Sequence, residues 1–334
     1  MSTASSPSSK TSVLRLQGVG HRYGAKTIFS GVSWCLEWGS RWSLLGSSGE
    51  GKSTLLALIA GAVALQEGRM YFQGAPYAEQ HQALLGRHPA IGYLAQQDYL
   101  QPVLSVVDNI AQAQRHIPER KAKAYRQEAL ERLGLAALAG QAVRQLSGGQ
   151  RQRVALAALL AGNWSLLLLD EPFGELDFPW RMAARRFLAD HAGEAAVVLV
   201  SHDPAEALPF AGSLAYLDGG RLQIPGTPRR VFHHPPSAKL ARITGEVNEL
   251  DAAWREYFQT EESLVRPSHI RKVEAGGVPV LLKEKAMGVG GEHWWIGQEN
   301  SPLLLQMAAP PEAVLGKGAP LEVNIKKPPR EEEA

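Results

Sequence analysis

The feature that most constrains the fold is the sequence GSSGEGKST at residues 46–54. An apolar run, RWSLL, precedes it, and a helical apolar pattern, STLLALIAGA, overlaps its end. Its glycines allow the backbone to curl around an anion with the N–H groups inward, and the helix presents its N-terminus to the same point. This strand–loop–helix order predicts a phosphate-binding P-loop at the edge of a parallel sheet.

Two further apolar runs, LLLLD at 166–170 and AVVLVSH at 196–202, lack alternating polar residues. Such runs are typical of parallel strands that are covered on both faces. Helical patterns lie between the runs, for example AYRQEALERLGLAAL. The strand–helix alternation over 40–235 therefore predicts an α/β domain. Before it, the segment 12–38 predicts two or three short strands broken by glycines.

Composition excludes several classes of protein. The chain has 334 residues with 35 basic and 33 acidic side chains, a net charge of +2, so the balance does not favour nucleic acid as a partner. Its single cysteine, Cys35, excludes an internal disulfide and is expected to be a small buried apolar residue. The longest apolar run, 154–169, is too short to span a bilayer. The polar residues 1–11 predict a disordered tail, and we expect a cytoplasmic location.

The P-loop predicts a nucleoside triphosphate site. Lys52 is placed to reach the β- and γ-phosphates, and the Ser53 hydroxyl to bind Mg²⁺. Glu50 is unusual in such a loop, because it brings negative charge near the phosphates unless it points outward. The residues expected to bind the phosphates are Gly46, Ser47, Ser48, Gly49, Gly51, Lys52, Ser53 and Thr54.

Two acidic residues end the buried run LLLLDE. Asp170 is expected at the strand end facing the P-loop, where it would assist in holding magnesium. Glu171 is assigned to orienting and polarising the attacking water. The alternative is that one of the two acids is a structural cap.

A second candidate anion site is the sequence QLSGGQRQR at 145–153, where a hydroxyl and two glycines precede the helical run VALAALL. This sequence resembles the signature motif of the ATP-binding cassette (ABC) family. GSSGEGKST, the signature sequence and LLLLDEP follow one another in the order typical of that family, and the resemblance covers about residues 12–236. It implies a P-loop NTPase fold with a RecA-like parallel sheet core, an antiparallel β subdomain and a helical subdomain at about 97–150.

The resemblance also implies roles for three residues outside these motifs. Tyr23 matches the aromatic residue that stacks on adenine, with a packed strand tyrosine as the alternative. Gln96 matches the glutamine that contacts Mg²⁺ and the attacking water, with Gln97 as its neighbouring rival. His202 matches the histidine that contacts the γ-phosphate, although a histidine at a strand end is also an ordinary polar cap.

In the ABC family, two copies pack head to tail, which explains why one chain carries two phosphate loops. Ser147, Gly148, Gly149 and Gln150 would then bind the γ-phosphate held by Lys52 of the second copy. The D-loop, usually SALD in the family, is GELD here, at 174–177. Asp177 is kept, whereas Glu175 adds a charge where the second copy approaches.

After residue 236 the sequence changes character. Short segments separated by glycine and proline predict a small β-barrel-like domain, so 237–334 is expected to hold a linker, a C-terminal domain and a charged tail. LVRPSHIRKV resembles the regulatory (TOBE-like) β-domain of importer ATPases for ferric iron, sulfate, molybdate, polyamines and sugars. A β appendage without a regulatory role is the alternative. Trp294 and Trp295 are expected in the core of this domain rather than at a ligand site.

These resemblances predict the ATP-hydrolysing subunit of an ABC importer for an oxyanion, ferric iron or a polyamine. The implied cofactors are ATP and Mg²⁺. The implied partners are a second copy, separate transmembrane permease subunits and an extracytoplasmic substrate-binding protein, with the chain on the inner face of the cell membrane. The alternatives are an exporter ATPase and a soluble ABC ATPase without a transport role. The last is disfavoured because the segment 55–145 is too short for a long coiled coil, only one cassette is present and no basic patch with interleaved aromatics is found.

Overall fold

The computed structural model describes residues 12–77, 88–95, 100–114, 117–261, 263–273, 277–288, 291–297, 304–310 and 319–325. The expected tail at 1–11, the charged end of the chain and the candidate residues Gln96 and Gln97 lie outside these ranges. The chain divides into two compact units, Met1–Pro225 and Gly226–Ala334.

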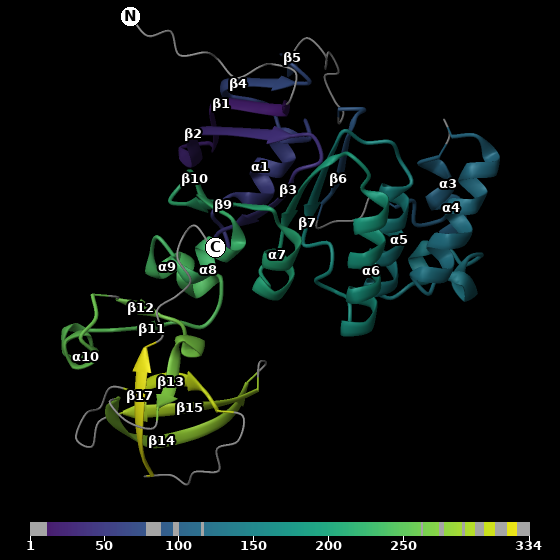
Figure 1. Ribbon diagram of the computed structural model, residues 1–334. Coiled ribbons are helices and arrows are strands. Elements are labelled where there is room, and N and C mark those ends of the chain that lie inside the picture. Colours follow the sequence, from purple (N-terminus) through teal and green to yellow (C-terminus); the bar gives the residue numbers. More distant parts are fainter. Residues whose placement is uncertain are drawn as a thin grey trace, which may run out of the picture. The chain divides into compact units, whose positions relative to one another are not determined.

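The first unit is built on a six-stranded sheet with the order β10-β9-β3-β8-β7-β6 (Figure 1). Its strands are β3 (Arg41–Leu45), β6 (Ile91–Leu94), β7 (Leu166–Asp170), β8 (Ala196–Val200), β9 (Ser213–Asp218) and β10 (Arg221–Gly226). The pairs β6/β7, β7/β8, β3/β8 and β3/β9 are parallel. The predicted parallel core is confirmed, and it brings the carboxyl ends of β3, β7 and β8 to one edge.

Each face of this sheet is covered by its own core. Leu166 and Leu168 of β7 pack in a core with α1 (Lys52–Ile59) and the antiparallel sheet. Their neighbours Leu167 and Leu169 pack in a second core with the helices α5 (Gly148–Leu160) and α6 (Phe178–His191). Because successive side chains of a strand point to opposite faces, a strand buried on both sides is apolar throughout.

An antiparallel sheet with the order β2-β1-β4-β5 completes the strands of the first unit. Its strands are β1 (Ser12–Tyr23), β2 (Lys26–Glu37), β4 (Glu67–Phe72) and β5 (Ala75–Pro76). The segment 12–38 forms two strands, within the expected number, but the expectation that they are short is wrong, because β1 and β2 each run for 12 residues. The glycines of β1 lie at shifts of register, so they bulge the strand without ending it.

The expectation that Cys35 is buried is also wrong. Its neighbours Trp34 and Leu36 are both buried in the first core, and Cys35 between them is exposed. Strand alternation therefore places the thiol on the outer face of β2.

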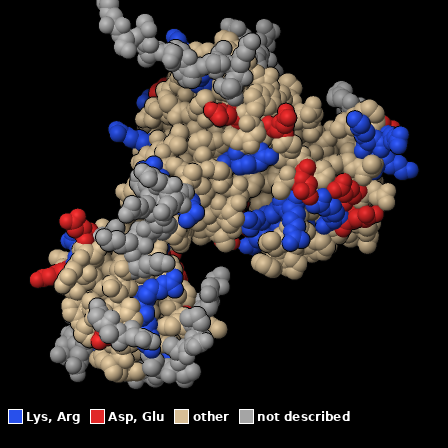
Figure 2. All heavy atoms as spheres, viewed as in Figure 1, with Lys and Arg blue, Asp and Glu red and all other residues tan. Residues whose placement is uncertain are grey.

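The described residues of the first unit include further helices, which form its helical part or follow the parallel strands. They are α3 (Val106–Gln112), α4 (Glu119–Arg132), the short helices η1 (Ala136–Leu138) and η2 (Val143–Gln145), and α7 (Pro204–Phe210). Acidic and basic side chains are mixed over the helical part on the face shown in Figure 2. Arg132 of α4, for example, pairs with Glu128 at 2.8 Å and with Asp190 of α6 at 2.6 Å.

The second unit carries a five-stranded antiparallel sheet, β13-β17-β14-β15-β16, and the pair β11-β12. Its strands are β11 (Asn248–Glu249), β12 (Leu264–Val265), β13 (Ile270–Val273), β14 (Val278–Gly288), β15 (Gly291–Gly297), β16 (Leu305–Ala308) and β17 (Pro320–Ile325). Its helices are α8 (Pro228–His233), α9 (Ala238–Ile243), α10 (Ala252–Phe258) and η3 (Pro267–His269). The predicted C-terminal β domain is confirmed. Trp294, 0% exposed, lies in its core as expected, whereas its neighbour Trp295 is half-buried and does not belong to the core, since adjacent strand residues point to opposite faces.

Among the described residues, no helix combines the length and the apolar composition that crossing a bilayer requires.

Candidate functional site

The P-loop joins β3 to α1, as its sequence predicts. Gly51, just before the helix, has φ 96°, and a Cβ there would collide with the side chain of Ile28. Only glycine fits this position, because the left-handed backbone and the close approach both exclude a side chain. The Lys52 Nζ donates hydrogen bonds to the carbonyl oxygens of Gly46 at 2.8 Å and Ser47 at 2.9 Å. The lysine therefore folds back over its own loop.

The carboxylates of Asp170 and Glu171 share this edge of the sheet with Lys52. Burial raises the pKa of Asp170, against the opposing effects of a hydrogen bond from Ser53 and the charge of Lys52. Burial lowers the pKa of Lys52, against the opposing charges of Glu171, Asp170 and Glu50. Asp170 is only 3% exposed. A half-buried lysine thus lies near the buried carboxylate of Asp170 and the half-buried carboxylate of Glu171.

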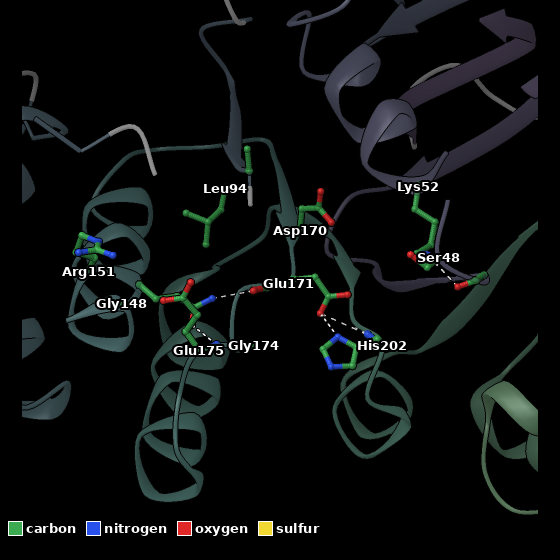
Figure 3. Close-up of a pocket in the computed structure, with 13 residues that line it drawn as sticks. Ser48, Lys52, Leu94, Gly148, Arg151, Asp170, Glu171, Gly174, Glu175 and His202 are labelled. Carbon is green, nitrogen blue, oxygen red and sulfur yellow. Dashed lines mark hydrogen bonds and ion pairs between the residues drawn. The ribbon is translucent and has the colours of Figure 1, made fainter. Parts of the chain in front are cut away.

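Glu171 and His202 meet at the ends of β7 and β8 (Figure 3). His202 Nδ1 lies 2.8 Å from Glu171 Oε2, and the same oxygen is 3.4 Å from the His202 backbone nitrogen. Glu171 has a φ of 52°, an uncommon value for a residue with a side chain. The His202 side chain is 78% exposed, so the pair is open to solvent on one side.

These residues line a cavity of about 700 Å³. Ser48 and Lys52 of the P-loop lie at one end, and Gly148 and Arg151 of α5 lie at the other (Figure 3). The lining also includes Gly46, Leu94, Ala95, Gln152, Asp170, Glu171, Gly174, Glu175 and His202. The cavity has the size of a ligand site.

The signature sequence forms the start of α5. Ser147 is the N-cap and makes a capping box with Gln150, whose backbone N–H donates to the Ser147 Oγ at 3.3 Å. A Cβ on Gly148 would collide with the Glu175 carboxylate, and one on Gly149 with the Glu175 carbonyl oxygen. Gly149 is therefore required where α5 packs against the backbone of the loop 174–177, whereas at Gly148 the flexible Glu175 side chain can move aside.

The structure brings some of the predicted site residues together and leaves others apart. The P-loop, Asp170, Glu171, His202 and Gly148 share the cavity described above. Tyr23 lies at the end of β1, 55% exposed and edge-on to His21 with ring centroids 4.8 Å apart, and it does not line the cavity. Asp177 is the N-cap of α6 and exposed.

Glu50 points away from the phosphate loop. Its Oε2 accepts a hydrogen bond from the Gly219 backbone N–H at 2.8 Å. The carboxylate that was unexpected in a P-loop thus serves to anchor the loop to the turn after β9.

Sequence reasoning missed two residues that connect the motifs. The Gln152 side chain donates to the Glu171 carbonyl oxygen at 2.8 Å and accepts from the Glu175 N–H at 2.9 Å. Its position inside the signature sequence was the available signal. Arg181, near the start of α6, contacts Asp203 and Glu206, which both follow His202, and only the fold places them together.

Comparison with known proteins assigns the chain to a family. A family model described as "ABC transporter" matches residues 29–174. The sulfate/thiosulfate import ATP-binding protein CysA of Gloeobacter violaceus is 38% identical over 281 residues, which cover 80% of this chain and 80% of that protein. The chain belongs to the ABC transporter family. Other ABC relatives are CysA of Bordetella parapertussis, 33% identical over 89% of this chain and 91% of its own, and the Fe(3+) ions import ATP-binding protein FbpC 2 of Rhodococcus jostii, 39% identical over 72% and 70%.

Two solved structures share the ABC fold. An ATP binding subunit of an ABC transporter has a TM-score of 0.61 and 22% identity, with 69% of this chain and 97% of that chain covered. A bacterial Atm1-family ABC exporter with ATP bound also has a TM-score of 0.61, with 25% identity; the match covers 72% of this chain but 43% of the exporter. As a member of the family, the chain is a nucleotide-binding ATPase whose activity is coupled to transport.

Proposed function

We propose that this chain is the ATP-hydrolysing subunit of an ABC importer. The observation that carries the proposal is the coverage of the import ATP-binding relatives: the match to the Bordetella protein spans 89% of this chain, so it includes much of the second unit as well as the ATPase unit. The exporter structure, by contrast, matches 72% of this chain and less than half of its own.

The phosphates are proposed to lie on the P-loop, with Lys52 leaving its two backbone carbonyls to contact the β- and γ-phosphates. The donor set also fits magnesium, because Ser53 and Asp170 offer hard oxygen ligands that already share a hydrogen bond. Ser53, Asp170 and Gln96 would hold the ion. Bound magnesium would supply neutralisation of the phosphate charge.

Hydrolysis is proposed to depend on Glu171 and His202. The Glu171 carboxylate is within hydrogen-bond distance of His202 Nδ1, which holds it in a defined orientation. A carboxylate so held can accept a proton from an attacking water, while the exposed histidine is free to contact the γ-phosphate. Positioning and charge, rather than a covalent intermediate, are what this chemistry requires.

A second copy is proposed to complete each site. Ser147, Gly148, Gly149 and Gln150 of one copy would bind the nucleotide held by the other, and Asp177 would lie at the contact between copies. Tyr23 is proposed to stack on the adenine. Its ring is exposed, as such a role requires, and His21 supports it from one side.

The cassette is proposed to extend over 12–236, with its helical subdomain at about 97–150, and the C-terminal TOBE-like domain to lie within 237–334. The proposed partners are two permease subunits in the membrane and an extracytoplasmic binding protein, with the chain on the inner face of the cell membrane. A small inorganic ion is the preferred cargo, because the relatives described above are named for sulfate, thiosulfate and Fe(3+).

The test of the chemistry is an ATPase assay on the purified chain and two variants. Glu171→Gln is expected to bind ATP like the parent and to hydrolyse it at least about 100-fold more slowly, since a general base contributes this much. Lys52→Ala is expected to weaken ATP binding itself, whereas the exposed Lys123→Ala on α4 is the charge-matched control. Hydrolysis by Glu171→Gln at the parent rate would contradict the assignment of the base.

A further inference from the structure

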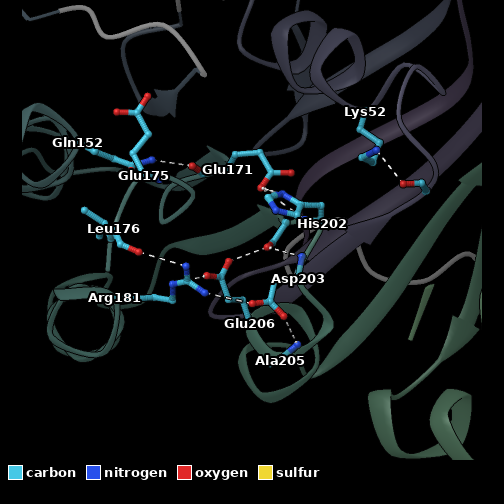
Figure 4. Close-up of polar contacts among 12 residues, drawn as sticks. Lys52, Gln152, Glu171, Glu175, Leu176, Arg181, His202, Asp203, Ala205 and Glu206 are labelled. Carbon is cyan, nitrogen blue, oxygen red and sulfur yellow. Dashed lines mark hydrogen bonds and ion pairs between the residues drawn. The ribbon is translucent and has the colours of Figure 1, made fainter. Parts of the chain in front are cut away.

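Arg181 joins two loops that flank the proposed reaction site (Figure 4). It lies on the first turn of α6, just after the loop 174–177. Its Nη2 donates to the carbonyl oxygen of Leu176 at 3.1 Å, and its Nη1 donates to Asp203 Oδ2 at 3.2 Å. Its Nε lies 3.1 Å from Glu206 Oε1. One guanidinium therefore contacts the D-loop and both acids that follow His202.

The two acids hold the backbone on either side of His202. Glu206 Oε2 accepts a hydrogen bond from the Ser201 hydroxyl at 2.6 Å, and the Ser201 Oγ accepts one from the Asp203 N–H at 3.1 Å. Asp203 Oδ1 also caps α7 by accepting from the Ala205 N–H at 2.8 Å. These hydrogen bonds fix the residues on either side of His202, and the His202 ring faces Glu171.

Burial makes the arginine necessary to this arrangement. Glu206 is only 3% exposed, and a buried carboxylate is costly without a partner of opposite charge. A guanidinium is suited to the task, since its planar fork can serve two carboxylates and a carbonyl oxygen at once. An ammonium group is a point charge and cannot reproduce all three contacts.

We propose that Arg181 is a positioning residue for ATP hydrolysis, which locks the D-loop to the loop that carries His202. The inference rests on the proposed function, in which the D-loop contacts the second copy. Docking of that copy against 174–177 would then be transmitted through Arg181 to the Glu171–His202 pair. Arg181 itself need not touch the nucleotide.

The experiment compares the full chain with Arg181→Met, Arg181→Lys and a control, Arg186→Met. Arg186 lies on the same helix, and its side chain is exposed. We expect Arg181→Met to bind ATP within about twofold of the parent, but to lose about tenfold or more in kcat and to lose sigmoidal dependence on ATP concentration. Arg181→Lys should recover part of kcat, and Arg186→Met should match the parent. An unchanged kcat and an unchanged ATP dependence in Arg181→Met would overturn the proposal.

A double variant separates positioning from simple stability. Arg181→Met alone leaves the buried Glu206 unpaired, whereas Arg181→Met with Glu206→Gln removes both charges. If the double variant melts near the parent yet keeps the low kcat and the loss of cooperativity, positioning is supported. If it regains parental kcat and cooperativity, Arg181 serves only to neutralise Glu206 and the proposal fails. A parent chain that does not hydrolyse ATP would instead contradict the proposed function.

Discussion

Glu175 is the residue at which this chain departs from the ABC pattern in a way that changes charge at the site. Its carboxylate lies against Gly148 at the N-terminus of α5, a position that favours a negative group. In the proposed dimer, the γ-phosphate of the second copy would need the same place. Glu175 should therefore oppose closure of the dimer by charge repulsion.

We predict that Glu175→Gln lowers the ATP concentration needed for dimerisation by about two- to fivefold, the range expected for one charge at a helix end. Light scattering during ATP titration measures the ATP concentration at which half of the chains are dimeric. Both proteins carry Glu171→Gln as well, so that ATP is not hydrolysed during the titration. Glu194→Gln, an exposed acid at the turn before β8, is the matched control. A midpoint that is unchanged or higher in Glu175→Gln would show that the carboxylate does not oppose closure.

Single residues differ in how far the sequence alone could place them. Lys52, Asp170 and Glu171 belong to short motifs whose spacing along the chain already implies a common sheet edge, and the structure places them there. The contact of Arg181 with Glu206 depends on how α6 packs beside α7, which no local pattern encodes. Cys35 was misplaced because its small apolar character was given more weight than strand alternation.

The packing of α4, α5 and α6 depends on one glycine. Gly134, just after α4, has φ 62°, and a Cβ there would enter the ring of Trp180. That ring also lies under the Arg153 guanidinium, 4.2 Å from the ring centroid. The Arg153 Nη1 in turn donates to the carbonyl oxygen of Leu133 at 2.5 Å, which ties α5 to the end of α4.

We predict that Gly134→Ala lowers the free energy of unfolding by about 2 kcal/mol, because it combines a strained left-handed backbone with overpacking against Trp180. Urea unfolding measures the change. Gly140→Ala is the control, since a Cβ at Gly140 meets open space, and its effect should stay within about 0.5 kcal/mol. Equal effects of the two substitutions would contradict this account of the packing.

In the second unit, η3 and α8 meet through a pair of histidines. The rings of His233 and His269 are stacked with centroids 5.3 Å apart, and His233 Nδ1 lies 3.2 Å from His269 Nε2. Burial lowers the pKa of His269 from 6.5 to about 4, and the nearby charges of His233, Arg266, Arg271 and His234 act in the same direction. Burial also lowers the pKa of His233.

This pair should make the second unit less stable in acid. The pKa of His269 is about 4 in the folded chain and 6.5 in the unfolded chain. Between these two values the unfolded chain binds a proton that the folded chain does not, so the free energy of unfolding falls as pH decreases from 6.5 towards about 4. We predict that His269→Gln flattens this dependence in urea unfolding at about pH 7.5 and about pH 4.5. NMR titration of the His269 ring reports its pKa directly. A normal pKa, or the same pH slope in the variant, would contradict the prediction.

Among secondary-structure elements, long apolar runs were predictable and short or irregular elements were not. β7 and β8 followed from runs without alternation, whereas the glycines of β1 suggested breaks that the structure absorbs as bulges. The helix α10, seven residues long, was not foreseen. Its Trp254 and Phe258 are held by the core of the second unit, so tertiary packing rather than local pattern defines it.

The whole molecule divides into an ATPase unit and a β unit, which agrees with the proposed ATP-hydrolysing subunit that works with separate permease chains. The cavity described above is lined by P-loop and signature residues and belongs to the proposed nucleotide site. The proposed function requires that this subunit assemble with an importing permease.

This assembly can be tested by purifying the tagged full-length chain from detergent-solubilised native membranes and identifying the chains that accompany it. We expect recovery of a multi-span permease together with an extracytoplasmic binding protein, whose ligand would name the cargo. The Glu171→Gln variant with ATP should stabilise the assembly, because it traps the closed dimer. Recovery of an exporter-type permease alone, or of ribosomes or DNA without any membrane protein, would contradict the importer assignment.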